Sequence, residues 1–465
     1  MLTKLDHAGA WLSKRPNQIA VFIGLWLAHV AFHLGFGATV KPYADEAMYW
    51  GLATNWVRDG LLHYGGYYIS DFMPGYPALM RLIFEIFGVN RWSIYLVQDA
   101  MQVTSAFVLF AAVKRGYSQA AAFVTFVLFA FYPAGFVYPG TSTGETLIIL
   151  LASTLVWLST APTYRPLRLG LLAGLTLGIA AITKPEYIFW SPGIFLLGAR
   201  DIANRTWRNR ALATAVTMAT MACVLLPWNL RNREVFGESI WLSTAGGRTW
   251  WLSAHKPFLT EFTQPPFEVA LRECARKVGR EGLSNLRCEA DPNPHDAVTC
   301  VWGPMEEHNG RMCQRCDIET KPALMDACLK KAAVAMILEH PGYTFGAMFR
   351  RIPMLFIGSH TESLFGFHDS FGNYIAGKVW DRVALKLTFL GWHSALVISG
   401  LLAWAWLVIK QQRFDWGYWV AIKIALHLFI MSTPRYSLHL YPMLLSAAGV
   451  AAVYFAQKKS PAAVP

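Results

Sequence analysis

The chain has 465 residues, of which 54% are hydrophobic and only 15% are charged, and its formal net charge is +12. A soluble domain carries about 25% charged residues, so this composition excludes an ordinary soluble protein and predicts one that lies largely in lipid. The basic residues cluster between apolar runs, so membrane topology accounts for the positive charge and we expect no nucleic-acid partner.

Apolar runs along the chain fit about ten spanning helices, because roughly 20 apolar residues in a helix cross the hydrocarbon layer. The first run is too long for the apolar part of a signal peptide and lacks a small-x-small cleavage site, so we expect an uncleaved anchor. The predicted fold class is an all-α polytopic membrane protein. The expected spans are Gln18 to Phe36, Trp92 to Val113, Ala120 to Phe136, Thr143 to Leu158, Leu167 to Ile182, Tyr187 to Ala199, Ala211 to Leu226, Leu385 to Ile409, Trp416 to Ile430 and Leu438 to Phe455.

Along the chain, short loops rich in Lys and Arg alternate with short loops that carry little charge. Lys and Arg prefer the cytoplasmic side, which places both termini in the cytoplasm. The short run from Tyr187 is supported as well, because Arg168 and Arg205 share a side only if the chain crosses twice between them. Lys184-Pro185-Glu186 then lies at an outer tip. We expect a bacterial inner-membrane protein whose active site faces the periplasm.

Two outer segments are large, residues 38–90 and residues 228–384. They divide the chain into an N-terminal membrane module (1–227) containing the first outer loop, a periplasmic segment (228–384) and C-terminal membrane helices (385–465). Within the second segment, Arg351 to Phe367 is apolar but too short to span comfortably, so we expect it to lie in the interface or re-enter. A full span there would invert the later orientation and break the agreement with the charge pattern.

The cysteines point to an oxidising compartment. One of the seven, Cys223, lies in an apolar run, and the other six lie in the second outer segment. An even set in a polar segment predicts disulfides, although six cysteines allow 15 pairings. A zinc site is the alternative, but it rests on Cys313-x-x-Cys316 alone. The disulfide candidates are Cys274, Cys288, Cys300, Cys313, Cys316 and Cys328.

The first outer loop combines carboxylates with aromatic rings. A helix beginning at Asp45 would favour that charge at its first turn and would put Asp45 and Tyr49 on one face, with Glu46 and Trp50 on another. Rings stack on sugars, and carboxylates bind or deprotonate sugar hydroxyls. The alternative is an interfacial amphipathic helix with a capping acid. A second short helix follows Pro74 and carries an arginine and a glutamate.

Other polar residues collect at the same predicted membrane face, and each has a plain structural alternative. Glu145 could cap the span that it opens, and Lys184 and Glu186 could form a turn salt bridge. Arg435 begins the last span, where a cation opposes the helix dipole, so it needs an anionic head group or a partner carboxylate. The further residues are Asp71, Arg231 and Tyr436.

Ionisable residues also occur inside the predicted spans. Lys423 and His427 share a helix face, and we expect the lysine to snorkel to the cytoplasmic surface. Asp99 lies in the outer half of its span, where we expect a neighbour to pair with it. We find no phosphate-binding glycine loop, no nucleophile elbow and no histidine-rich metal motif.

Four stretches together resemble the GT-C membrane glycosyltransferases, in the branch with protein O-mannosyltransferases and the lipid A aminoarabinose transferase. The cysteine-rich segment is not part of that pattern, and Lys184-Pro185-Glu186 departs from the Arg-Pro-Glu expected. The stretches are A-D-E-A-M-Y-W (Ala44 to Trp50), P-G-Y-P (Pro74 to Pro77), P-W-N-L-R-N-R-E-V-F-G (Pro227 to Gly237) and P-R-Y-S-L-H-L-Y-P (Pro434 to Pro442).

The resemblance implies an inverting transfer of a sugar from a polyprenyl-phosphate donor to an acceptor hydroxyl at the outer face. It assigns Asp45 as general base, ahead of Glu46, and Arg435 as the cation at the leaving phosphate. It leaves open the sugar, the acceptor (lipid, glycan or protein) and a divalent Mg or Mn ion between carboxylates. Assistance from Lys184 or Arg231 is expected, and hydroxyl-binding or orienting candidates are Glu46, Asp71, Glu145 and Glu186.

Two other function classes fit parts of the sequence. A transporter or flippase of a lipid-linked sugar would place polar residues throughout the spans, whereas here they concentrate at one face. A sensor or assembly protein could use the cysteine-rich segment to bind a partner, but it would not need so many charged residues at one membrane level. The enzyme is therefore the favoured hypothesis.

Overall fold

The structure is a computed structural model of the chain. It describes residues 1–36, 45–64, 68–161, 165–197, 206–255, 273–274, 284–288, 299–308, 311–319, 322–358, 371–430 and 434–459.

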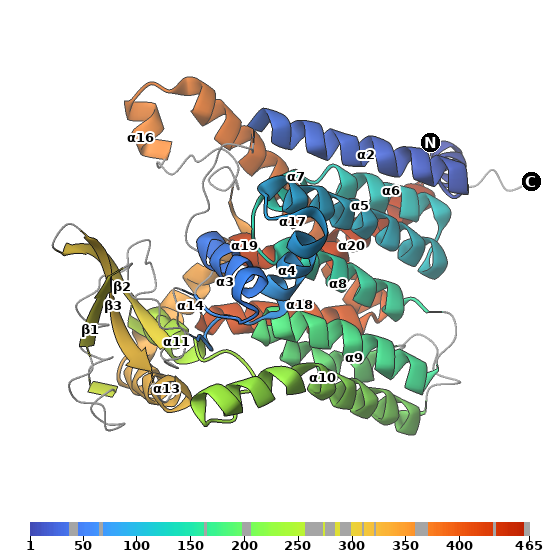
Figure 1. Cartoon of the computed structure of the whole chain (residues 1–465). Helices are drawn as coiled ribbons and strands as arrows, with labels where there is room; N and C mark the ends of the chain where they lie inside the picture. Colours follow the sequence, from blue (N-terminus) through green and yellow to red (C-terminus); the bar gives the residue numbers. More distant parts are fainter. Residues whose placement is uncertain are drawn as a thin grey trace, which may run out of the picture.

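The membrane part consists of helices that pack side by side in one bundle (Figure 1). The helices before the second outer segment are α1 (Leu2–Leu12), α2 (Arg15–Phe36), α3 (Asp45–Asp59), α4 (Gly75–Phe87), α5 (Arg91–Gly116), α6 (Gln119–Ala130), α7 (Pro133–Val137), η1 (Tyr138–Gly140), α8 (Glu145–Ser159), α9 (Pro166–Thr183), η2 (Pro185–Leu196) and α10 (Trp207–Phe236). Those from residue 371 onward are α16 (Phe371–Ala376), α17 (Trp380–Gln411), α18 (Phe414–Phe429), α19 (Pro434–Ser437), η3 (Leu438–Leu440) and α20 (Tyr441–Lys459).

Each of the predicted spans coincides with a helix, although not all are long enough to cross a membrane alone. Within the described residues, six helices are long and apolar enough, or seven if the bent pair Gln119–Ala130 and Pro133–Gly140 counts as one span. α8 is a shorter apolar helix, and the run from Tyr187 forms a 3-10 helix. The chain is therefore a multi-pass membrane protein, while the number of spans stays a prediction.

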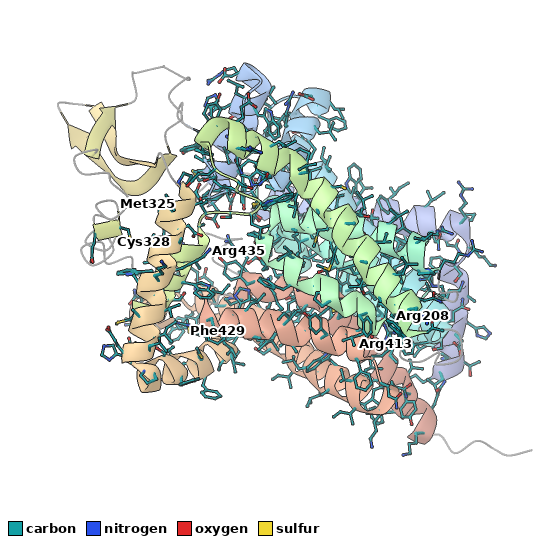
Figure 2. All side chains as sticks on the ribbon, turned by 90° about the horizontal axis from the view of Figure 1, so that it is seen from below. Arg208, Met325, Cys328, Arg413, Phe429 and Arg435 are labelled. Carbon is teal, nitrogen blue, oxygen red and sulfur yellow. A yellow bond between two sulfur atoms is a disulfide. The ribbon has the colours of Figure 1, made fainter. Side chains whose placement is uncertain are left out.

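The two ends of the bundle carry different kinds of residue. Figure 2 shows Arg208 and Arg413, from two of the basic loops, together at one end of the bundle. Met325 and Cys328, from the second outer segment, lie at the other end. This separation fits the predicted orientation, in which the basic loops face the cytoplasm.

Small residues let α9 and α10 pack closely. Gly170, Gly174 and Gly178 recur every fourth residue on α9. A Cβ atom at Gly170 would lie 2.7 Å from the Ala213 carbonyl oxygen, and one at Gly174 would lie 2.7 Å from that of Thr217. Close backbone approach of this kind is a common way for membrane helices to associate, because lipid offers no hydrophobic drive between them.

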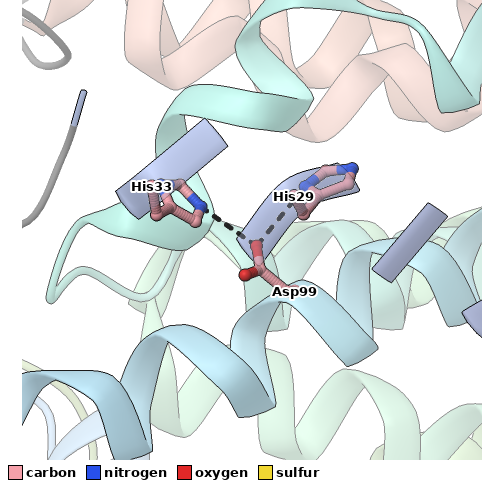
Figure 3. A group of neighbouring side chains, drawn as sticks. All are labelled: His29, His33 and Asp99. Carbon is pink, nitrogen blue, oxygen red and sulfur yellow. Dashed lines mark hydrogen bonds and ion pairs between the residues drawn. The ribbon is translucent and has the colours of Figure 1, made fainter. Parts of the chain in front are cut away.

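The buried ionisable residues of the spans have partners. Figure 3 shows Asp99 of α5 facing His29 and His33 of α2, as predicted for an acid that needs a neighbour. Lys423 does not snorkel, and that prediction is wrong. Its side chain is fully buried, and its Nζ atom donates to Glu186 Oε1 at 2.8 Å. Pairing inside the bundle replaces hydration of the ammonium.

The second outer segment contains α11 (Gly246–His255), α13 (Pro322–Glu339), α14 (Pro341–Phe356) and three strands, β1 (Ser284–Cys288), β2 (Thr299–His308) and β3 (Arg311–Glu319). The strands form an antiparallel sheet in the order β1-β3-β2. The all-α prediction holds for the membrane part but did not include this sheet.

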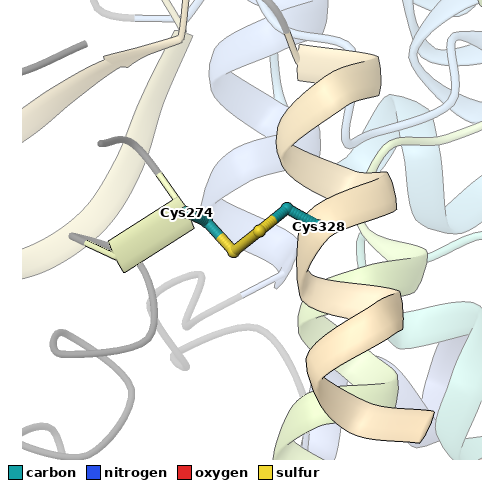
Figure 4. The surroundings of a disulfide bond; sticks show 2 residues. All are labelled: Cys274 and Cys328. Atoms are coloured by element: carbon teal, nitrogen blue, oxygen red, sulfur yellow. A yellow bond between two sulfur atoms is a disulfide. The ribbon is translucent and has the colours of Figure 1, made fainter. Parts of the chain in front are cut away.

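Within the described residues, one disulfide is formed, between Cys274 and Cys328, with an S–S distance of 2.07 Å (Figure 4). It attaches residues 273–274 to α13 and supports the prediction of an oxidising compartment. Cys223 is free and exposed on α10. The side chains of the other candidates lie outside the described residues; these are Cys288, Cys300, Cys313 and Cys316.

The apolar stretch from Arg351 begins inside a longer helix. α14 starts at Pro341 and is not among the helices long and apolar enough to span. Arg351 itself is buried, donating from Nη1 to the Leu428 carbonyl at 2.7 Å and from Nη2 to that of Ser253. It therefore ties α14 to α18 and α11. Residues 359–367 of the stretch lie outside the described residues.

Candidate active site

Four of the charged residues singled out in the sequence come from the starts of four separate elements. Asp45 is the first residue of α3, Glu145 the first of α8, and Glu186 lies in the first turn of η2. Acidic residues are favoured there by the helix dipole. Arg435 lies in α19, at the start of the final apolar segment. Because these element starts meet near the outer segment, residues far apart in sequence converge.

Arg435 bridges two carboxylates. Its Nη2 atom lies 2.5 Å from Asp45 Oδ2, and its Nε atom lies 3.2 Å from Glu145 Oε1. Lys184 Nζ donates to the same Glu145 oxygen at 2.8 Å. The side chain of Glu145 is 1% exposed, whereas that of Asp45 is 40% exposed. One continuous chain of charges therefore runs from a buried end at Glu145 to an accessible end at Asp45.

The turn salt bridge between Lys184 and Glu186 is not formed in the described structure. Lys184 pairs with Glu145, while Glu186 pairs with Lys423 at 2.8 Å. Lys423 Nζ also lies 3.3 Å from His439 Nδ1. The sequence analysis did not assign Lys423 or His439 to the site. The available signal was a lysine inside a span, which is costly unless it has a partner.

Glu46 sits in a less polar setting than its neighbour. Its Oε2 atom accepts a hydrogen bond from the Ser142 backbone N–H at 3.3 Å. Burial raises the pKa of the Glu46 carboxyl to about 6, and the Ser142 bond and the cations Arg91 and Arg435 only partly oppose this. A carboxyl that titrates near neutral pH is suited to acid–base work.

Aromatic rings line the site, as predicted. Tyr49 packs edge-on against Phe72 and Tyr76, with ring centres 5.5 and 5.2 Å apart. Burial raises the pKa of Tyr49, so its hydroxyl stays protonated. The ring of Tyr436 lies 5.3 Å from both Lys184 Nζ and Arg435 Cζ, which places two cations against one aromatic ring.

Arg231 and Asp71 have other surroundings. Arg231 donates to the carbonyls of Ile69 and Leu62 at 3.0 and 3.1 Å, so it holds the first outer loop. Burial raises the pKa of Asp71, and Arg248 is the cation that opposes this shift. Neither residue is hydrogen-bonded to the Arg435 chain of charges in the described structure. Their expected roles as donor-binding residues stay predictions.

The carboxylates suited to a divalent cation are Asp45 and Glu145. Arg435 already lies between them and supplies the positive charge that a cation would bring. A metal between these two acids would require the guanidinium to turn away. In this conformation the residues present do not fit a metal between them, and the Mg or Mn ion that the resemblance left open stays untested.

The sequence and the fold of this chain are similar to those of known proteins. Residues 71–228 match the family model described as "Dolichyl-phosphate-mannose-protein mannosyltransferase". A stretch of 170 residues is 25% identical to "Putative mannosyltransferase YkcB" of Bacillus subtilis (strain 168), covering 36% of this chain and 23% of that protein. The archaeal oligosaccharyltransferase AglB from Archaeoglobus fulgidus matches 98% of this chain over 53% of its own, at 14% identity and a TM-score of 0.50.

The predicted resemblance to the GT-C membrane glycosyltransferases is confirmed. ArnT from Cupriavidus metallidurans, solved with undecaprenyl phosphate, matches 94% of this chain over 78% of its own at 15% identity, but with a TM-score of only 0.41. At such identities the structural likeness establishes the GT-C fold alone. The chain spans 23% of the curated relative and about half, 53%, of the archaeal protein, so its activity is a matter for proposal.

Proposed function

We propose that the chain is an inverting glycosyltransferase that moves a sugar from a polyprenyl-phosphate donor to an acceptor hydroxyl. The observation that carries this proposal is Arg435, which joins the accessible Asp45 to the buried Glu145–Lys184 pair. Transfer from a lipid phosphate needs cations for the leaving phosphate next to a carboxylate for the acceptor proton. Both lie at the end of the bundle that we place at the outer face of a bacterial inner membrane.

The donor phosphate would engage Arg435 by opening one of its two carboxylate contacts. The contact with Asp45 is the one that opens more easily, because Asp45 is 40% exposed and solvent can replace the guanidinium there. The contact with Glu145 is buried, and Lys184 reinforces it. Donor binding would therefore free Asp45 from Arg435 at the moment when a base is needed. The archaeal oligosaccharyltransferase AglB was solved with a dolichol-phosphate, which supports this donor class.

The reaction is a single displacement. The acceptor oxygen attacks the anomeric carbon and Asp45 takes the hydroxyl proton. The bond between the anomeric carbon and the phosphate oxygen breaks, and the electron pair leaves with the polyprenyl phosphate, where Arg435 and Lys184 stabilise the charge. Attack opposite the leaving group inverts the anomeric centre. Glu46, with its pKa of about 6, is the second candidate base or binds a sugar hydroxyl.

Tyr49, Tyr436 and the acids beside them would hold the sugar. Aromatic rings supply flat apolar surfaces for a pyranose or furanose ring, while buried carboxylates accept hydrogen bonds from its hydroxyls. Glu186 is fixed by Lys423, so we assign it to orientation of the cation cluster rather than to proton transfer. The acceptor can be a lipid, a glycan or a protein.

The alternative is a flippase of a lipid-linked sugar. We would reconstitute the full chain in nanodiscs with a panel of undecaprenyl-phosphate hexoses and pentoses, adding envelope extract from a deletion strain as the acceptor source. Release of undecaprenyl phosphate, detected by mass spectrometry, is expected for one donor. Transbilayer movement of an intact donor in proteoliposomes, with no release from any donor, would support the flippase instead.

A further inference from the structure

Three metal-ligand side chains meet inside the bundle, outside the site described above. His29 and His33 lie one turn apart on α2, and Asp99 faces them from α5 (Figure 3). His33 Nε2 lies 3.0 Å and His29 Nδ1 lies 3.3 Å from the same oxygen, Asp99 Oδ1. All three side chains are buried, and one donor atom from each lies within 4.8 Å of the others.

The two distances to Asp99 Oδ1 match those between donor atoms around one small cation. Zinc bonds of about 2.0–2.1 Å in a tetrahedral site separate neighbouring donors by about 3.3 Å. A spacing of four residues puts both imidazoles on one helix face, and two histidines with one carboxylate form a common ligand set for divalent transition metals. The set leaves positions open for water or another donor.

The hydrogen bonds among these three residues leave some of their polar atoms without a hydrogen-bond partner. His33 Nε2 has hydrogen-bonding geometry with Asp99 Oδ1, but His29 Nδ1 has no hydrogen bond within the described residues, and neither has Asp99 Oδ2. Buried polar atoms normally have partners, and leaving them without one is costly. A cation between the three donors would satisfy His29 Nδ1 and offset the carboxylate charge.

The cluster lies behind a loop that contributes to the candidate active site. A Cβ atom at Gly140, which ends η1, would lie 2.6 Å from His33 Nδ1, so the backbone there packs directly on the imidazole. Gln98, next to Asp99, donates to the carbonyls of Pro139 and Thr141 at 3.0 and 2.7 Å. The same loop then supplies the Ser142 N–H that binds Glu46.

We propose that His29, His33 and Asp99 form a binding site for one divalent transition metal, with zinc preferred, which clamps α2 to α5 and supports the loop from Tyr138 to Gly144. The ligands are imidazole nitrogens and one carboxylate oxygen, a set that suits zinc better than magnesium or calcium, which favour all-oxygen sites. The site is separate from any cation bound between Asp45 and Glu145, and it does not depend on the proposed sugar transfer.

The test is metal content in the purified full chain. Protein isolated through a non-metal affinity tag is stripped with chelator, supplied with Zn²⁺, dialysed and analysed by inductively coupled plasma mass spectrometry. We expect about one tightly bound zinc per chain for wild type and for His63→Gln, a buried histidine of the first outer loop used as control. His33→Gln and Asp99→Asn should each weaken binding by at least about tenfold.

Two measurements keep the test decisive if a variant folds poorly. Co²⁺-loaded wild type should show visible d–d absorption bands that Zn²⁺ abolishes, and chelator should lower its thermal midpoint reversibly. Wild type that binds no zinc and has an unchanged midpoint would overturn the proposal. Zinc retained fully by folded Asp99→Asn, or lost in Asp45→Asn, would also overturn it by placing the metal elsewhere.

Discussion

Arg435 is the residue that links the charged side chains of the candidate active site. The sequence analysis required either an anionic ligand or a partner carboxylate for a cation at this position, and the structure supplies two carboxylates. These two carboxylate partners do not exclude binding of the donor phosphate to Arg435. The accessible contact with Asp45 can open, while the buried contact with Glu145 keeps the guanidinium in place.

Removing the guanidinium should weaken donor binding. Arg435→Gln eliminates a charged hydrogen-bond donor to phosphate, and we expect about 10–100-fold weaker binding of undecaprenyl phosphate, measured by native mass spectrometry. Arg81→Gln, which breaks the exposed pair with Glu85 on α4, is the matched control and should bind normally. Equal affinity in the two variants would remove Arg435 from the phosphate site.

Glu46 should make the stability of the protein depend on pH. Its pKa is raised from 4.5 to about 6 in the folded state, so the protonated form is favoured by folding. Stability is then highest below pH 4.5 and falls as pH rises through 6, by an amount on the order of 2 kcal/mol. Glu46→Gln keeps the neutral form at every pH.

As the pH rises from about 4.5 to 7, the thermal midpoint of Glu46→Gln should therefore rise relative to that of wild type. Glu85→Gln, at an exposed glutamate of α4, should show no such trend. A constant difference between Glu46→Gln and wild type across this range would mean that Glu46 is not held in an environment that favours its neutral form.

The buried pair between Lys423 and Glu186 gives a double-variant test. Lys423→Met leaves the Glu186 carboxylate without its cation, which typically costs about 3–5 kcal/mol, and the thermal midpoint should fall clearly. Adding Glu186→Gln removes the orphaned charge and should restore much of the loss. If the double variant is as unstable as the single one, the pair is not coupled as the structure shows.

That the charged residues would gather at one end of the bundle could be predicted, but their partners could not. Charge counts placed Asp45, Glu145 and Arg435 at one face, which is where they meet. Which acid pairs with which base depends on helix rotation and tilt, and a single sequence does not determine these. For that reason a Lys184–Glu186 salt bridge was left open as an alternative, and Lys423 was expected to snorkel.

At the level of elements, the close contact of α9 and α10 can be tested with one methyl group. Gly174→Ala would place Cβ 2.6 Å from Thr220 Cβ and 2.7 Å from the Thr217 carbonyl, so the helices must separate and the thermal midpoint should fall. Gly24→Ala on α2 is the control, because nothing lies within 4 Å of its Cβ position. A midpoint unchanged in both variants would show that the two helices are not packed this tightly.

Helices were easier to predict than their lengths. Long apolar runs are sufficient to indicate membrane helices, which is why each expected span coincides with one. Polar residues that continue a helix beyond the apolar part are not visible in hydropathy. α10 therefore extends from Trp207 to Phe236, well beyond the predicted Ala211 to Leu226, and α14 begins ten residues before Arg351.

The whole molecule combines a membrane bundle similar in fold to the GT-C glycosyltransferases with an outer segment of mixed structure. Apolar composition and loop charges were enough to predict the bundle. The three-stranded sheet was not predicted, because its strands lie in a polar, cysteine-rich stretch without clear alternation. α14 of the outer segment contacts α19, the helix that carries Arg435, so in the proposed reaction the segment would be placed to influence acceptor choice.

The most direct test of the proposed function compares two acids of the same helix. Asp45→Asn should reduce turnover of the accepted polyprenyl-phosphate sugar by about 10²–10⁴-fold, as expected for loss of a general base, with the fold preserved. Asp59→Asn, at the opposite end of α3 and paired with Arg58, should keep wild-type turnover. Wild-type turnover in a folded Asp45→Asn variant would contradict the central role given to Asp45.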